Sequence, residues 1–163
     1  KDTLSLGVCN GCQLMMELGL IDKTKGPRPM LHNNSGKFES NYITVNIPEN
    51  NSVMLGSLSG SRLGIYVAHG EGKFDISEGD YNLIMTYTSA DYPTNPNGSA
   101  LNTAGVVSSD GRHLAMMPHI ERAIFPWQCA HYPLSRKKDE ITPWLEGFVN
   151  AFNWVKENST VIK

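Results

Sequence analysis

The sequence predicts an α/β domain built on a mixed β-sheet, and three observations support this fold class. The chain opens with a short apolar strand that passes through a glycine turn into a helical pattern, as in α/β units. Several later segments alternate apolar and polar residues, which is typical of half-buried strands. Because these strands outnumber the helices, we expect a mixed sheet with flanking helices and not a purely parallel one.

The first half of the chain is expected to hold one helix and four strands. Residues 3–8 form the opening strand, and the helix begins at Cys12, because Leu14 and Leu18 recur at helical spacing. Gly19 is the expected stop of this helix. Alternating residues predict three further strands, at 43–47, 63–67 and 83–87.

The second half is expected to hold a hairpin and a terminal helix. A turn at 108–111 separates two apolar runs, 106–107 and 114–117, so these runs are expected to pair. Thr142 is the expected cap of the last helix, with Pro143 in its first turn. Four apolar residues are expected on the buried face of that helix: Trp144, Phe148, Phe152 and Val155.

Length and composition are those of a folded domain. With 163 residues, of which 40% are hydrophobic and 18% charged, we expect one domain over residues 1–163 and no long disordered segment. The net charge of −2 gives no electrostatic reason to expect nucleic acid or an anionic membrane as a partner. Three cysteines are too few for a disulfide framework, and an odd number cannot all pair within one chain. A reducing compartment, the cytoplasm, is therefore the expected location.

The segment around Cys9 places a thiol between two glycines at a strand-to-helix turn. Gly7 and Gly11 let the backbone turn sharply and leave room around the sulfur. The start of the helix behind Cys9 is expected to favour the thiolate, and backbone N–H groups there can hold an oxyanion. The pattern therefore predicts a nucleophile elbow.

His119 and Glu121 follow an apolar strand. Residues two apart in an extended chain point to the same side, so the imidazole and the carboxylate are expected to emerge together. Glu121 would then orient the ring while its other nitrogen faces Cys9, which predicts a Cys-His-Glu triad. His69, in a His-Gly-Glu-Gly segment, either lines the same cleft or belongs to a turn between strands.

Six segments in order make the chain resemble class I (triad) glutamine amidotransferases. Within that class it is most similar to the C-terminal glutaminase domains of the phosphoribosylformylglycinamidine synthase family. The resemblance implies a flavodoxin-like fold with flanking helices. The segments are GVCNGCQ at 7–13, HNNSGKFES at 32–40, AHGEGKF at 68–74, YPTNPNGS at 92–99, MMPHIERAIFPWQ at 116–128 and TPWLEGFVNAFNW at 142–154.

The resemblance implies a role for particular residues. Cys9 corresponds to the nucleophile, His119 to the base and Glu121 to its orienting partner. Six residues are implied in binding glutamine or its reacting amide, two of them in the loop 32–39: Asn10, Gly11, Gln13, Asn34, Ser35 and His69.

The implied reaction hydrolyses glutamine through a cysteine thioester, giving glutamate and ammonia. The partner would be a synthetase domain of the same polypeptide, which uses ATP and Mg²⁺ to amidate formylglycinamide ribonucleotide in purine biosynthesis. No phosphate-binding glycine–lysine motif is visible, so we expect no cofactor and no metal in this chain.

Two departures from the family pattern concern His119 and the start of the chain. Ile120 stands where the wider family usually has proline. The chain begins at Lys1, and the family's glycine-rich loop that completes the oxyanion hole lies upstream of the nucleophile strand. We therefore expect an N-terminally truncated glutaminase domain that is nearly inactive alone and whose opening strand lies at a sheet edge or beneath another chain. There are two alternatives: an inactive scaffold that docks on the synthetase, or a glutaminase that supplies ammonia to another acceptor.

Two rival interpretations use the cysteines differently. Cys9 and Cys12 form a C-x-x-C pair, which suggests a redox dithiol, but the aromatic and proline context of thioredoxin-type motifs is missing. Cys9, Cys12, Cys129 and His131 together would make a zinc site. Packed free thiols are the favoured interpretation of Cys12 and Cys129.

Overall fold

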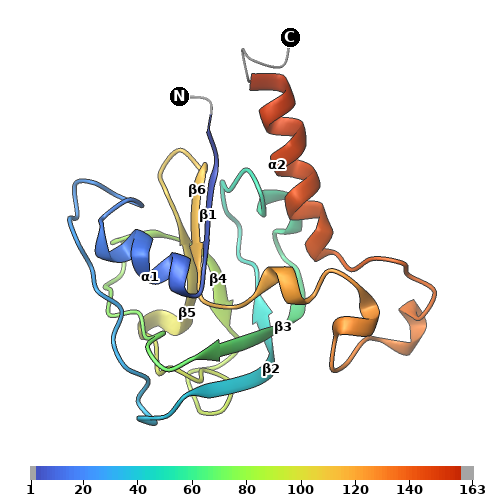
Figure 1. Cartoon of the computed structure of the whole chain (residues 1–163), viewed down its shortest axis with the longest axis horizontal. Coiled ribbons are helices and arrows are strands. Elements are labelled where there is room, and N and C mark those ends of the chain that lie inside the picture. The colour runs from blue at the N-terminus through green and yellow to red at the C-terminus, as the bar shows by residue number, and fades with distance from the viewer. Residues whose placement is uncertain (1–2, 159–163) are drawn as a thin grey trace.

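The computed structural model describes residues 3–158 of the chain. Two helices flank a six-stranded sheet in this part of the chain (Figure 1). The elements in chain order are β1 (Ser5–Val8), α1 (Asn10–Glu17), β2 (Glu39–Asn46), η1 (Gly56–Leu58), β3 (Arg62–His69), β4 (Asn82–Tyr87), η2 (Ala100–Asn102), β5 (Thr103–Val107), β6 (His113–Met116), η3 (Ile120–Arg122), η4 (Pro126–Gln128), η5 (Leu134–Arg136) and α2 (Trp144–Asn158), where η marks a 3₁₀ turn.

The sheet is mixed, as expected. Its strand order is β1-β6-β5-β4-β2-β3. β1 pairs with β6 in parallel, whereas the other neighbouring strands are antiparallel. In the parallel pair Val8 lies opposite Met116, so the chain leaves both strands at the same end of the sheet. β1 lies at one edge, which confirms the expected edge position of the opening strand.

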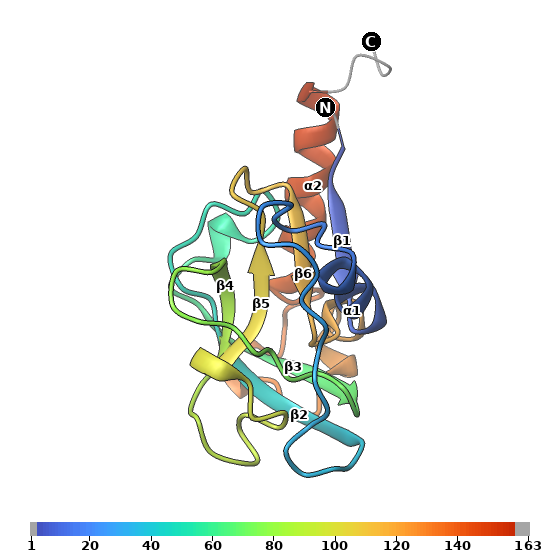
Figure 2. The ribbon, with the colours of Figure 1, turned by 90° about the vertical axis from the view of Figure 1, so that its left-hand side faces the viewer.

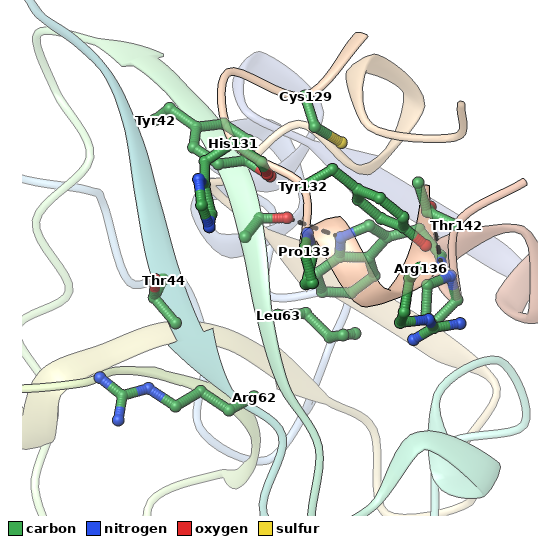
Figure 3. A pocket seen from close by; sticks show the side chains of 13 residues that line it. Tyr42, Thr44, Arg62, Leu63, Cys129, His131, Tyr132, Pro133, Arg136 and Thr142 are labelled. Carbon is green, nitrogen blue, oxygen red and sulfur yellow. Dashed lines mark hydrogen bonds between the residues drawn. The ribbon is translucent and has the colours of Figure 1, made fainter. Parts of the chain in front are cut away.

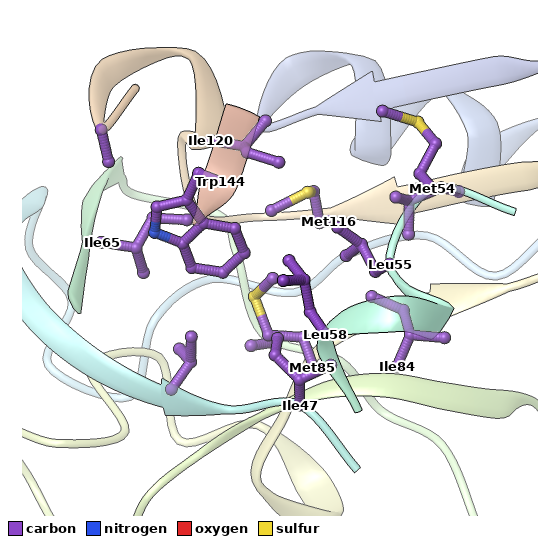
Figure 4. Close-up of a cluster of buried hydrophobic side chains, with 14 of the residues drawn as sticks. Ile47, Met54, Leu55, Leu58, Ile65, Ile84, Met85, Met116, Ile120 and Trp144 are labelled. Atoms are coloured by element: carbon purple, nitrogen blue, oxygen red, sulfur yellow. The ribbon is translucent and has the colours of Figure 1, made fainter. Parts of the chain in front are cut away.

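Alternation along β5 and β6 builds a core on each face of the sheet. Val106 and Ala115 face a cluster with Met15, which comes from α1. Val107, Leu114 and Met116 face the other cluster, in which the indole of Trp144 from α2 is 1% exposed (Figure 4). One helix therefore covers each face of this part of the sheet, as the predicted fold class requires.

The sheet curls, and the curl brings β3 to the end of β1 and β6 (Figure 1 and Figure 2). The outer edge of β3 accepts two hydrogen bonds from that region. The backbone N–H of His119 donates to the carbonyl of Tyr66 at 2.8 Å, and the thiol of Cys9 lies 3.5 Å from the carbonyl of Ala68. Residues from both edges of the sheet thus meet at one site.

Most expected elements are confirmed, with differences in their bounds and in one buried face. The strand expected at 43–47 begins already at Glu39, and the run expected at 114–117 ends at Met116. α1 begins at Asn10 and not at Cys12, because the turn at Cys9 leads directly into the first helical hydrogen bond, from the N–H of Gln13 to the carbonyl of Cys9. The strand expected to reach residue 47 ends at Asn46. Phe152 was expected on the buried face of α2 but is 67% exposed, whereas Phe148, one turn earlier, packs against the core.

Candidate active site

Cys9 occupies a sharp turn between β1 and α1, as the nucleophile-elbow pattern predicts. Its backbone has φ 51° and ψ −105°, a combination rare for any residue with a side chain. Such a conformation costs roughly 1–3 kcal/mol, which the surrounding structure must supply. A Cβ at Gly7 would lie 2.6 Å from the carbonyl oxygen of Gly11, so only glycine lets the strand approach the helix this closely.

His119 and Glu121 meet at the end of β6, as predicted. The Nδ1 atom of His119 lies 2.6 Å from Oε1 of Glu121. The backbone between them is the 3₁₀ turn η3 and not the extended chain that we expected; the turn still places both side chains together. Nε2 of His119 is buried and has no hydrogen-bond partner among the described residues.

An orphaned imidazole nitrogen is chemically informative. Buried polar atoms nearly always have a hydrogen-bond partner, so a buried nitrogen without one indicates a position where a ligand or reacting group binds. Met116 lies three residues before His119 in the chain. Its carbonyl accepts a hydrogen bond from the backbone N–H of Cys9 at 2.9 Å, which joins the two sides of the site. With Glu121 fixing Nδ1, Nε2 is the nitrogen left to exchange a proton with a reacting group.

The protonation state of Cys9 differs from the sequence prediction. Burial raises the pKa of the Cys9 thiol, and the backbone N–H of Asn10 only partly opposes this effect. The charge of Glu121 raises this pKa further, and that of Arg122 lowers it. The start of α1 therefore does not make Cys9 a resting thiolate, and a base is needed to remove its proton.

A raised pKa predicts a pH-dependent labelling rate. Only the thiolate reacts with iodoacetamide, so labelling of Cys9 should rise with pH through neutrality, about tenfold per pH unit while the pH stays below the pKa. Cys12 is fully buried and its pKa is also raised, so it should react last. Peptide mass spectrometry at several pH values measures this. A Cys9 rate that is already level at pH 6 would contradict the raised pKa.

Two of the predicted glutamine-binding residues lie beside the elbow. Asn10 and Gln13 line a hollow of about 230 Å³ together with Glu71. The side-chain amide of Gln13 donates to the carbonyl of Glu71 at 2.6 Å, which ties α1 to the loop after β3. An added Cβ at Gly11 would meet no atom within 4 Å, so open space lies beside this turn of the helix.

Two other predicted residues line a different hollow. Asn34 and Ser35 border a space of about 500 Å³ that includes neither Asn10 nor Gln13. The Asn34 side chain accepts a hydrogen bond from Nζ of Lys73 at 2.9 Å. The structure thus divides the predicted binding residues between two places.

A third hollow, of about 490 Å³, contains none of the predicted site residues (Figure 3). It lies over β2 and β3, where Tyr42, Cys129 and Trp144 contribute to its wall. Neither Cys9 nor His119 lines this hollow, so Cys129 does not share it with them.

His69 lies below the surface of the site. It is the last residue of β3 and only 2% exposed, and its ring contacts the side chain of Asn97. Sequence reasoning missed Asn97 and its neighbour Asn33, which are also buried. Both belong to segments that carry the family resemblance, but an amide without a titratable group gave no chemical signal.

The rival interpretations of the cysteines gain no support. All three cysteines are free. Within residues 3–158, no three His, Cys, Asp or Glu side chains gather closely enough to hold a metal ion. Cys12 is fully buried in the core beneath α1, as the favoured interpretation predicts.

The chain resembles known proteins over nearly its whole length. A family model described as CobB/CobQ-like glutamine amidotransferase domain matches residues 1–155. The phosphoribosylformylglycinamidine synthase of Drosophila melanogaster is 43% identical over 182 residues, which cover 97% of this chain and 13% of that protein. The human protein of the same name is 40% identical over 187 residues, covering 97% of this chain and 14% of that protein.

A solved structure agrees with these relatives. The structure of PurLQS from Thermotoga maritima superposes with a TM-score of 0.72 at 27% identity, covering 94% of this chain and 62% of that one. The chain therefore spans about an eighth of the length of the curated relatives, and 62% of the structural one. In the described part of the chain, no helix is long and apolar enough to cross a membrane. The glutamine amidotransferase family expected from the sequence motifs is thus confirmed: the chain belongs to the CobB/CobQ-like glutamine amidotransferase domain family.

Proposed function

We propose that this chain is the glutaminase part of a phosphoribosylformylglycinamidine synthase. In this role it hydrolyses glutamine through a thioester on Cys9 and supplies ammonia to the rest of the enzyme. The observation that carries the proposal is the state of His119: Nδ1 is held by Glu121 at 2.6 Å, and Nε2 is buried without a partner among the described residues. The Cys9 thiol and the His119 backbone N–H both contact β3, at the carbonyls of Ala68 and Tyr66. The similarity to named synthases supports the same assignment.

The first half of the reaction forms the thioester. His119 takes the proton of the Cys9 thiol, whose raised pKa makes this transfer necessary. The thiolate attacks the side-chain amide carbon of glutamine, and the negative charge moves to the amide oxygen. The N–H of Asn10, in the first turn of α1, is the donor that we assign to this oxygen. The His119 imidazolium then protonates the leaving nitrogen, which departs as ammonia.

The second half releases glutamate. Neutral His119 removes a proton from water, and the resulting hydroxide attacks the thioester carbon. The carbon–sulfur bond breaks, and His119 returns its proton to the Cys9 sulfur. Glu121 holds the ring in one orientation throughout and stabilises the imidazolium that forms twice in each cycle.

Glutamine recognition is assigned to residues beside the elbow. Asn10 and Gln13 line the hollow beside α1, and open space lies next to Gly11; we assign the side chain of a bound glutamine to this region. Asn34 and Ser35 line the hollow over the loop 32–39 and are proposed to meet the polar end of the amino acid. Their amide and hydroxyl groups suit a charged ammonium and carboxylate pair.

The fate of the ammonia is also part of the proposal. We assign ATP and Mg²⁺ to a synthetase domain of the same polypeptide, where formylglycinamide ribonucleotide would be converted to its amidine. No step at Cys9 passes through either group. The three free thiols suit a reducing compartment, and we keep the cytoplasm as the expected one.

The experiment that tests this function measures glutamate and ammonia from glutamine in equal amounts. It should use the chain alone and a longer polypeptide that also carries the upstream and synthetase segments of its relatives. Hydrolysis that disappears in His119→Ala supports the proposal. A longer polypeptide that binds the ribonucleotide substrate but forms no glutamate would overturn it in favour of a scaffold role.

We further expect turnover by the chain alone to be about 100- to 1000-fold below that of the longer polypeptide, since that is the cost of one missing oxyanion donor. The physical reason is that Asn10 supplies one N–H, while the family resemblance places the second on a loop upstream of β1. Comparable turnover of the two polypeptides would show that residues 1–163 hold a complete oxyanion hole.

A further inference from the structure

A buried polar network lies beneath the loop that follows β3. It joins three segments that are far apart in the sequence, through Asn33, His69, Tyr87 and Asn97. Asn97 is fully buried, and the other three are at most 3% exposed. The Asn97 side chain lies 3.0 Å from Nδ1 and 3.4 Å from Nε2 of His69, 3.3 Å from Oδ1 of Asn33 and 2.8 Å from the hydroxyl of Tyr87.

The orientation of each amide follows from its neighbours. The Asn33 amide nitrogen lies 2.7 Å from the carbonyl of His69 and 2.9 Å from that of Lys37, and carbonyls only accept. Oδ1 of Asn33 is therefore an acceptor, as its contact with the N–H of Gly72 also requires. The Asn97 amide must donate to this oxygen, so its NH₂ group is also the end that faces His69.

A donor facing the ring determines the state of His69. The Asn97 NH₂ group faces both ring nitrogens of His69 and is nearer to Nδ1, so at least one of them accepts its hydrogen bond and carries no proton, and the imidazole is neutral. Burial lowers the pKa of His69 to about 4, which agrees with this state at neutral pH. A hydrogen bond to its own backbone raises this pKa, nearby His119 lowers it, and Glu39, opposite it on β2, raises it. The Tyr87 phenol is neutral because burial raises its pKa.

The network also fixes the backbone beside the nucleophile. His69 follows Ala68, whose carbonyl contacts the Cys9 thiol at 3.5 Å. Two residues on, the carbonyl of Glu71 accepts the amide of Gln13. The next residue, Gly72, has no room for a side chain, because a Cβ there would collide with the amide nitrogen of Asn97. The loop is thus packed directly against the network.

We propose that Asn97 is a positioning residue of this site, which holds His69 as a neutral imidazole and thereby fixes the loop 69–72 beside Cys9. The expected effect on catalysis rests on the proposed glutaminase function. The neutral state of His69 and its contacts with Asn97 do not depend on that function. A charged His69 would also disfavour the imidazolium that His119 forms during the reaction. Asn97 itself touches neither Cys9 nor His119 in the hydrogen bonds of the described residues.

The first test observes His69 directly. The chain is labelled with ¹⁵N-histidine, and the ring nitrogens are followed by NMR between pH 5 and 8, with His69→Gln identifying the signal. We expect a neutral ring with one protonated nitrogen and no titration in this range. A His69 signal that titrates near the ordinary value of about 6.5 would overturn the proposal in the unaltered protein, without any variant at Asn97.

The second test replaces the donor. An Asn97→Asp carboxylate accepts where the amide donated, so we expect the pKa of His69 to rise to about 6.5 or higher. We also expect kcat/KM for glutamine to fall by about 10- to 100-fold, mainly through KM, since the displaced loop contacts Gln13. Iodoacetamide should still label Cys9, because β1 and α1 build the elbow.

Asn95→Ala is the matched control. Asn95 is buried in the same segment as Asn97, but its side chain bonds Gly98, Ser99 and Asn102 and not His69. It should lower the melting temperature and leave the His69 titration unchanged. An equal His69 shift in both variants would show a merely structural role for Asn97. Absence of ammonia release in every form would overturn the proposed function without altering the titration result, so the two failures are distinguishable.

Discussion

Cys9→Ala is expected to lower glutamine hydrolysis by at least about 10⁴-fold, the scale seen when a covalent nucleophile is removed from a triad. The reason is that no other described side chain replaces the sulfur: Cys12 is fully buried in the core, and Cys129 lines a hollow without triad residues. The measurement is glutamate release by the longer polypeptide under saturating glutamine.

Cys129→Ala is the matched control for this substitution. Like Cys9, this thiol is free and partly buried, and it lies 3.7 Å from a backbone carbonyl, that of Phe125. Its loss should leave glutamine hydrolysis close to that of the unaltered protein. Loss of activity in Cys129→Ala with full activity in Cys9→Ala would contradict the proposed nucleophile.

Glu121→Ala is expected to give the second-largest loss, but about 100-fold smaller than the loss in Cys9→Ala. The Glu121 side chain is half exposed, so water can partly replace it beside Nδ1 of His119. Turnover should fall because the ring loses its fixed orientation and its imidazolium loses a stabilising charge. Steady-state kinetics on folded variants measures the difference.

Glu78→Ala serves as its control, since Glu78 is an exposed carboxylate outside the site. It should leave turnover unchanged. If Glu121→Ala is as inactive as Cys9→Ala while its melting temperature is preserved, then Glu121 does more than orient the ring, and its role here must be revised.

Local patterns predicted the parts of the site that local geometry builds. Gly7 and Gly11 around Cys9 predicted a sharp turn, and the structure places that turn where the pattern indicates. The spacing of His119 and Glu121 predicted their contact, although a 3₁₀ turn and not an extended strand produces it. His119 lies just before the 3₁₀ turn with a non-helical backbone, φ −94° and ψ 88°, and this local conformation brings the two side chains together.

Features that depend on distant segments were not predictable in the same way. The raised pKa of Cys9 arises from burial, and burial depends on the curl that brings β3 to the elbow. The exposure of Phe152 depends on which side chains lie against that part of α2, which helical spacing does not specify. The network around Asn97 joins three segments whose proximity only the fold creates.

The central claim is that Cys9 attacks the side-chain carbonyl region of glutamine with the help of His119. The most direct measurement is labelling with diazo-oxo-norleucine, a glutamine-like electrophile, followed by peptide mass spectrometry. We predict one adduct, on Cys9, which excess glutamine suppresses and which forms much more slowly in His119→Ala. An adduct on Cys129 or Cys12, or a Cys9 adduct that neither glutamine nor the His119 substitution affects, would contradict the account.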